Sequence, residues 1–199
     1  FPERRKTRMA SDEDVLEFNE EAYIARENTN VVLTRNGRIK RVGRLATVEG
    51  TRVEEGDAVV AVVPGSTLDH VVFFADDGAA YTMRINEVPA TAGYGEPITK
   101  FFKLGDGVKV VAAVTTDPRF TPADWAEKGD APGGPYVLVT TRNGFVLRLP
   151  LTAYRAESTK AGRRYVKLEE GDKAVVVRLV GEEEGVMLAT AGGYVTHFP

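Results

Sequence analysis

One β-hairpin pattern occurs four times in this chain, and that repetition constrains the fold more than any single residue does. The copies are VVLTRNGRIKR (31–41), VVFFADDGAAYTMR (71–84), YVLVTTRNGFVLR (136–148) and VMLATAGGYVTH (186–197). Each joins two apolar runs through Asn-Gly, Asp-Gly or Gly-Gly, dipeptides that tolerate the positive φ angles of a type I′ turn. Repeats with a period of tens of residues are typical of stacked or radially arranged units that share a core.

A second element follows three of the hairpins. A Val-rich strand headed by Gly-Asp recurs in VEEGDAVVAVV (53–63), KLGDGVKVVAAV (103–114) and KLEEGDKAVVVRL (167–179). The middle unit is lengthened by TTDPRFTPADWAEKGDAPGGP (115–135), whose Pro, Gly and acidic residues predict an inserted surface loop.

These patterns predict an all-β fold, a pinwheel or propeller-like repeat of about four short-stranded blades. No strand pattern follows the last hairpin near 186–198 to cover its edge, so we expect an open or incompletely closed ring, or one that the N-terminal strand completes. Residues 20–199 form the predicted domain, with residues 20–24 as a leading strand. The charged residues 1–19 are a predicted linker, which fits a chain that begins at Phe1 as a piece of something longer. A tandem of small barrels is the alternative.

Composition excludes several kinds of site. The chain has no Cys, which removes disulfides, thiolate zinc sites and Cys nucleophiles together. Its two histidines, His70 and His197, have no partners at metal-ligand spacing. No apolar run approaches the roughly 20 residues that span a bilayer, and the first residues lack the apolar core of a signal peptide.

Positive charge is concentrated locally although the formal net charge is −3. The first basic stretch holds Arg35, Arg38, Lys40, Arg41 and Arg44, and the second holds Arg155, Lys160, Arg163, Arg164 and Lys167. Arg142 and Arg148 flank the third hairpin. Segregated charge of this kind suits a polyanion bound along one rim, although Lys and Arg also guard exposed strand edges without any ligand.

Several motifs resemble the C-terminal β-pinwheel of bacterial type IIA topoisomerase A subunits, meaning gyrase and topoisomerase IV. Thr34, Gly37, Lys40 and Arg41 match a Thr-x-x-Gly-Tyr-x-Lys-Arg signature of that family, with Arg38 at the aromatic position. TRNGFVLR (141–148), the long stretch 71–104 and AGRRYVKLEEGD (161–172) are also similar, so the resemblance covers residues 20–199. The connection 42–57 lacks the basic, Gly-rich gyrase box, which resembles topoisomerase IV more than gyrase.

The resemblance implies binding and bending of duplex DNA, without base specificity, by the twelve basic residues named above. It implies that the domain presents DNA to the catalytic core of the same chain, which works with an ATPase B subunit in the bacterial cytoplasm, at the nucleoid. ATP and Mg²⁺ are then cofactors of the parent enzyme, and this piece carries no catalytic residues and no cofactor or metal of its own.

Two other functions remain open from the sequence. One is a protein-interaction propeller that uses the 115–135 insertion, with Trp125 and Phe120 as contacts. The other is a pair of small barrels that bind RNA by stacking bases on exposed aromatics, for which Phe145 and Tyr194 are the candidates.

Overall fold

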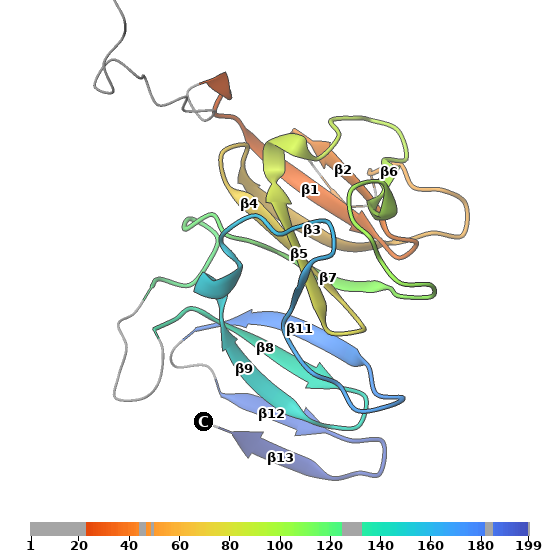
Figure 1. Cartoon of the computed structure of the whole chain (residues 1–199), viewed down its shortest axis with the longest axis vertical. Coiled ribbons are helices and arrows are strands. Elements are labelled where there is room, and N and C mark those ends of the chain that lie inside the picture. The colour runs from red at the N-terminus through yellow and green to blue at the C-terminus, as the bar shows by residue number, and fades with distance from the viewer. Residues whose placement is uncertain (1–22, 44–46, 49, 125–132, 182–184, 199) are drawn as a thin grey trace, which may run out of the picture.

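A computed structural model describes residues 23–43, 47–48, 50–124, 133–181 and 185–198. The described chain is built from short β-strands and 3₁₀ turns, arranged as four sheets that follow one another from the N-terminal to the C-terminal end (Figure 1). The predicted all-β class and the four hairpins are confirmed, and none of the sheets closes on itself.

We call the sheets blades 1 to 4. Blade 1 has the order β3 (Val59–Ser66), β1 (Asn28–Thr34), β2 (Arg38–Val42), β6 (Glu96–Pro97). Blade 2 has the order β7 (Val110–Thr115), β4 (His70–Ala75), β5 (Ala79–Arg84), β10 (Arg163–Arg164). Blade 3 has the order β11 (Ala174–Val180), β8 (Tyr136–Thr141), β9 (Val146–Pro150), and blade 4 is the hairpin β12 (Val186–Ala189), β13 (Val195–Phe198). The 3₁₀ turns are η3 (Ile85–Glu87), η4 (Ile98–Lys100) and η5 (Leu151–Tyr154).

The Gly-Asp-headed strands behave alike in all three units. Each pairs antiparallel with the first strand of its own hairpin, as β3 with β1, β7 with β4 and β11 with β8. Asp57 and Asp172 explain the Gly-Asp signal in two of them. The Asp57 carboxylate accepts from the amide of Asn36 at 3.0 Å, and that of Asp172 from the amide of Asn143 at 3.1 Å, so each closes the preceding hairpin turn.

The edge strands are exchanged between units. The strand β6 lies between β5 and β7 in the chain yet pairs with β2 of blade 1, and β10 follows β9 of blade 3 yet pairs with β5 of blade 2. Each of these two blades therefore has its outer edge covered by a two-residue strand that the next unit supplies.

The predicted type I′ turns are wrong. Among the described residues only glycines have positive φ, so Asn36, Asp77 and Asn143 cannot occupy the first position of such a turn. Instead the amide of Gly37 donates to the carbonyl of Thr34 at 3.0 Å, with Gly37 at φ 76°, which is a three-residue loop with a glycine bulge. The Thr34 hydroxyl accepts from the amide of Arg38 at 3.2 Å and stabilises this longer loop.

Blade 2 is covered on both faces, which explains its unbroken apolar run. Val71 and Phe73 pack toward blade 1, whereas Val72 and Phe74 pack toward blade 3, and all four side chains are fully buried. Side chains that alternate across a strand can contact two different neighbours in this way.

Other predictions about the chain ends and the insertion are only partly testable. Tyr23 and Ile24 do not form the expected leading strand, since β1 begins at Asn28. The predicted linker 1–19, and Trp125 in the insertion, lie outside the described residues.

Candidate nucleic-acid interface

The second basic stretch forms a strap, residues 158–167, that leaves blade 3 and runs along the outer edge of blade 2 (Figure 1). The amide of Ser158 donates to the Thr82 carbonyl at 3.0 Å, and the amide of Tyr165 donates to the Gly78 carbonyl at 2.8 Å. Between these contacts lies β10, which pairs with β5.

Tyr165 anchors the strap in the core between blades 2 and 3. Its hydroxyl donates to the carbonyl of Ala75 at 2.8 Å, and its ring meets that of Phe74 edge to face at 5.1 Å. Burial is the main cause that raises the pKa of the Tyr165 phenol, so the hydroxyl remains a donor. Because neighbouring strand residues point to opposite faces, an inward Tyr165 leaves Arg164 exposed.

The strap carries a group of cations that the described structure leaves without side-chain partners. Lys160, Arg164 and Lys167 are exposed, and none of them contacts an acidic side chain of a described residue. The side chain of Arg163 is also exposed, and it donates to the Ala153 carbonyl. Exposed cations without partners are the groups that neutralise phosphates most readily.

Lys103 joins this group although no sequence pattern predicted it as a binding residue. Its amide donates to the Lys160 carbonyl at 2.7 Å, which brings the two lysines side by side from segments far apart in the chain. Lys103 is exposed. The only local signal was its place in an acid-free stretch, residues 97–105, beside Lys100.

Arg155 lies just before the strap and has a partner. Its guanidinium donates two hydrogen bonds to the carboxylate of Asp124, at 2.9 Å and 2.5 Å. This bidentate pair neutralises the charge of both groups, so Arg155 is not one of the cations without partners.

The first basic stretch is mostly engaged within blade 1. The Arg38 guanidinium forms an ion pair with Glu54 at 2.6 Å and donates to the Gly95 carbonyl at 3.0 Å. Arg41 is mostly buried, with its Nε 3.4 Å from the Val88 carbonyl oxygen. Arg35 is exposed and lies near Asp57, and Arg44 falls outside the described residues.

Lys40 corrects the expectation that it belongs to an exposed basic edge. It is only 1% exposed, and its ammonium donates to the carbonyls of Arg52 and Gly93 at 2.5 Å and 2.7 Å. Burial, and then the charge of Arg52, lower the pKa of Lys40. The side chain therefore joins the loop between β2 and β3 to the loop that leads from η3 into β6.

The two arginines of the third hairpin differ from each other. The Arg148 guanidinium lies over the Tyr136 ring, 4.6 Å from its centroid, where a cation–π contact holds it. Arg142 is exposed, and its side chain has no partner among the described residues. Neither forms an ion pair with a described acidic neighbour.

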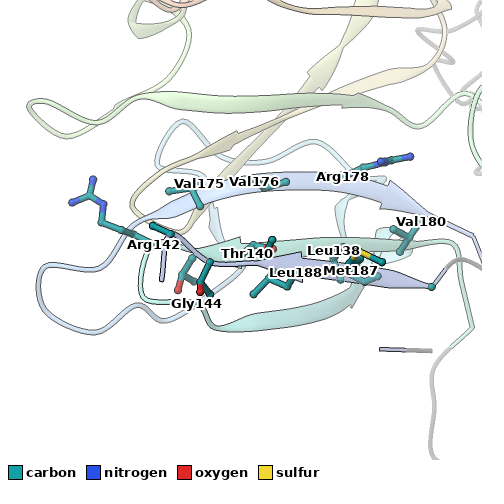
Figure 2. Close-up of a pocket in the computed structure, with 16 residues that line it drawn as sticks. Leu138, Thr140, Arg142, Gly144, Val175, Val176, Arg178, Val180, Met187 and Leu188 are labelled. Carbon is teal, nitrogen blue, oxygen red and sulfur yellow. The ribbon is translucent and has the colours of Figure 1, made fainter. Parts of the chain in front are cut away.

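Arg142 also lies at one end of an open groove lined by β8, β11 and β12, with a volume of about 830 Å³. Figure 2 shows Arg142 and Arg178 at opposite ends, with Val175 and Val176 on β11 facing Leu188 across the groove. The groove is mainly apolar, and its two arginines lie too far apart in Figure 2 to converge on one phosphate.

Several alternatives gain little from the structure. Phe145 and Tyr194 are exposed after their turns, and Phe120 of the insertion is also exposed. The Arg119 guanidinium covers one face of the Phe120 ring, 5.3 Å from its centroid. No group of three or more His, Asp or Glu side chains gathers as a metal site in the described ranges. In the same ranges, no helix is long and apolar enough to cross a membrane.

Comparison with known proteins agrees with this architecture. Residues 69–117 and 135–180 match the model of the DNA gyrase C-terminal domain, a β-propeller. The DNA gyrase A subunit of Streptococcus pyogenes is 28% identical over 205 aligned residues, covering 98% of this chain. A probable chloroplastic/mitochondrial DNA gyrase A subunit of Oryza sativa is 29% identical over 94% of the chain. This chain spans only 23% and 18% of the length of these two relatives.

Solved structures support the same fold. The C-terminal domain of DNA topoisomerase IV superposes with a TM-score of 0.70 at 21% identity, over 87% of this chain and 52% of that one. The Escherichia coli ParC C-terminal domain gives 0.69 at 21% identity, over 87% and 65%. The expected likeness to topoisomerase IV in preference to gyrase stays a prediction, because the similar sequences are those of gyrase. The chain belongs to the family of DNA gyrase C-terminal β-propeller domains, the β-pinwheels of type IIA topoisomerase A subunits.

Proposed function

We propose that this chain binds duplex DNA through its phosphates, without reading base sequence. The observation that carries the proposal is the set of exposed cations on one edge, Lys103, Lys160, Arg164 and Lys167, which have no acidic partner among the described residues. Membership of a family named for DNA gyrase supports a DNA ligand. Lys and Arg side chains that contact phosphates fix position on the duplex but carry no sequence information.

We further propose that the bound duplex is bent and presented to the catalytic core of the parent topoisomerase. Bending a short site costs about 1–6 kcal/mol, which additional phosphate contacts can offset. In the parent, the ATPase B subunit would be the partner, and ATP and Mg²⁺ would bind outside this domain. The cell compartment would be that of the nucleoid.

Binding of the 199-residue chain to two short duplexes of unrelated sequence, measured by fluorescence anisotropy across a salt series, tests the first proposal. We expect equal affinities for the two sequences and a linear fall of log affinity with log salt, with a slope of about −0.9 per phosphate contact. Absence of binding at low salt would overturn the proposal. Energy transfer between dyes at the duplex ends then measures bending, and an unchanged end-to-end distance on binding would contradict it.

A further inference from the structure

The outer edges of blades 1 and 2 are built in the same way. Ile39 pairs with Glu96 and Arg38 with Pro97 in blade 1, as Ala80 pairs with Arg163 and Ala79 with Arg164 in blade 2. The register makes β6 and β10 equivalent, so that Glu96 corresponds to Arg163 and Pro97 to Arg164.

Backbone geometry around the two strands supports this equivalence. The amide of Ile98 donates to the Gly37 carbonyl at 2.8 Å, just as the amide of Tyr165 donates to the Gly78 carbonyl at 2.8 Å. A glycine with positive φ precedes each strand, at 87° in one blade and 75° in the other. The two edges thus share a backbone and differ in their side chains.

The side chains of the blade 1 edge suit a duplex poorly. Glu96 is a carboxylate that forms an ion pair with the exposed Lys100 at 3.2 Å, and Pro97 has no amide to donate. The neighbouring strand contributes Arg38, which Glu54 already neutralises at 2.6 Å. A phosphate brought to this edge would meet a negative or balanced surface.

The blade 2 edge has the opposite character. Arg163 and Arg164 lie opposite Ala79 and Ala80, which carry no charge, so the paired residues of β5 supply no acid to neutralise them. Glu157, just before the strap, is paired with Arg84 at 3.0 Å. The hairpin turn carries two acids. Asp76 is paired with Lys173 at 2.6 Å, and the Asp77 carboxylate accepts a hydrogen bond from the Ala79 amide at 3.0 Å.

Resting on the proposed function, we propose that the phosphate-binding edge is confined to blade 2 and that Glu96–Pro97 marks its boundary at blade 1. Lys103 and Lys160 extend the basic surface beside β10, and Lys167 extends it past the hairpin turn of blade 2. The first basic stretch then lies on the side of the boundary away from the DNA.

The equivalence of the two edges allows a reciprocal test in the 199-residue chain. The loss variant is Arg163→Gln with Arg164→Gln, and the gain variant is Glu96→Arg with Pro97→Arg. Arg26→Gln with Arg178→Gln is the matched control, because it removes two exposed arginines that lie outside both edges. Circular dichroism and thermal melting establish that each variant is folded before binding is measured.

In the loss variant, the slope of log affinity against log salt should become shallower by about 1.8, because two phosphate contacts are removed. Its affinity at 0.1 M salt should fall by roughly tenfold to a hundredfold. The control should keep the slope, and the gain variant should steepen it by up to about 1.8. If the unaltered chain binds and the loss variant binds like the control, the assignment to blade 2 is overturned while DNA binding stands. A folded gain variant that binds no better than the unaltered chain overturns the boundary at blade 1. If the unaltered chain does not bind at all, the proposed function itself fails.

Discussion

The carboxylate of Asp76 accepts a hydrogen bond from the Lys173 ammonium at 2.6 Å, and this contact joins the hairpin turn of blade 2 to the residue that precedes β11 of blade 3. Asp76 is buried and also accepts from the Lys109 amide at 3.0 Å, while its carbonyl accepts from the Ala174 amide at 3.0 Å. One residue therefore closes its own blade and contacts the next.

Replacement of Asp76 by Ala should lower the free energy of unfolding by about 1–3 kcal/mol, because the Lys109 amide loses its carboxylate acceptor in a partly buried hydrogen bond. Lys173→Gln should cost less, about 0–1 kcal/mol, since the Lys173 side chain is 41% exposed. Urea denaturation of both variants checks the order. A larger loss for Lys173→Gln would contradict the role assigned to Asp76.

Lys40→Met should destabilise the domain without weakening DNA binding. The substitution keeps the length of the side chain but removes the donor to the carbonyls of Arg52 and Gly93, which should cost about 1–3 kcal/mol. Chemical denaturation and the salt slope of DNA binding are to be measured on the same preparation. A slope that falls by about one unit would show that Lys40 contacts a phosphate after all.

Acid stability should depend on Asp117. Hydrogen bonds from Arg119 are the main cause that lowers the pKa of the Asp117 carboxyl to about 2, below its ordinary value of 3.8. A depressed pKa contributes stability that is present above about pH 4 and is lost as the pH falls toward about 2. Arg119→Gln should raise that pKa, so the loss should begin at higher pH. Denaturation midpoints that follow the same pH profile in both proteins would contradict this account.

Asp69, beside Asp117, should lower the stability of the fold at neutral pH, whereas Asp117 raises it. Burial and the negative charge of Asp117 raise the pKa of Asp69, so its ionisation at neutral pH is unfavourable to the fold. Asp69→Asn should therefore increase stability at pH 7 by a few tenths to about 1 kcal/mol, and the gain should disappear below about pH 4. A thermal melt at each pH measures the effect, and a loss of stability at pH 7 would count against it.

Gly162→Ala should be much more damaging than Gly144→Ala, although both glycines have positive φ, 75° and 88°. An added Cβ at Gly162 would lie 2.6 Å from the Tyr81 ring and 2.9 Å from the Ala80 carbonyl oxygen, whereas at Gly144 it would meet nothing within 4 Å. The Gly144 variant isolates the backbone cost of about 1–2 kcal/mol, and the excess at Gly162 measures how closely the strap approaches blade 2. Equal losses would contradict that close approach.

The hairpins and the Gly-Asp-headed strands could be predicted because their signals are local. Apolar alternation and turn dipeptides place both strands of a hairpin within about fifteen residues, and β4 and β5 lie where the pattern put them. The turn type was missed because Asn-Gly suits two loop lengths. The hydroxyl of Thr34, which accepts from the Arg38 amide, favours the longer one.

Sequence alone determined that this chain is a β repeat of a type IIA topoisomerase family and that its positive charge lies in two stretches. Tertiary structure decided which of these charges are free. Lys40 is held by backbone carbonyls 12 and 53 residues away in the sequence, and Arg38 by a carbonyl 57 residues away. Arg164, in contrast, lies opposite the uncharged Ala79 of the neighbouring strand. Burial and charge neutralisation depend on contacts between distant segments, and no local pattern records them.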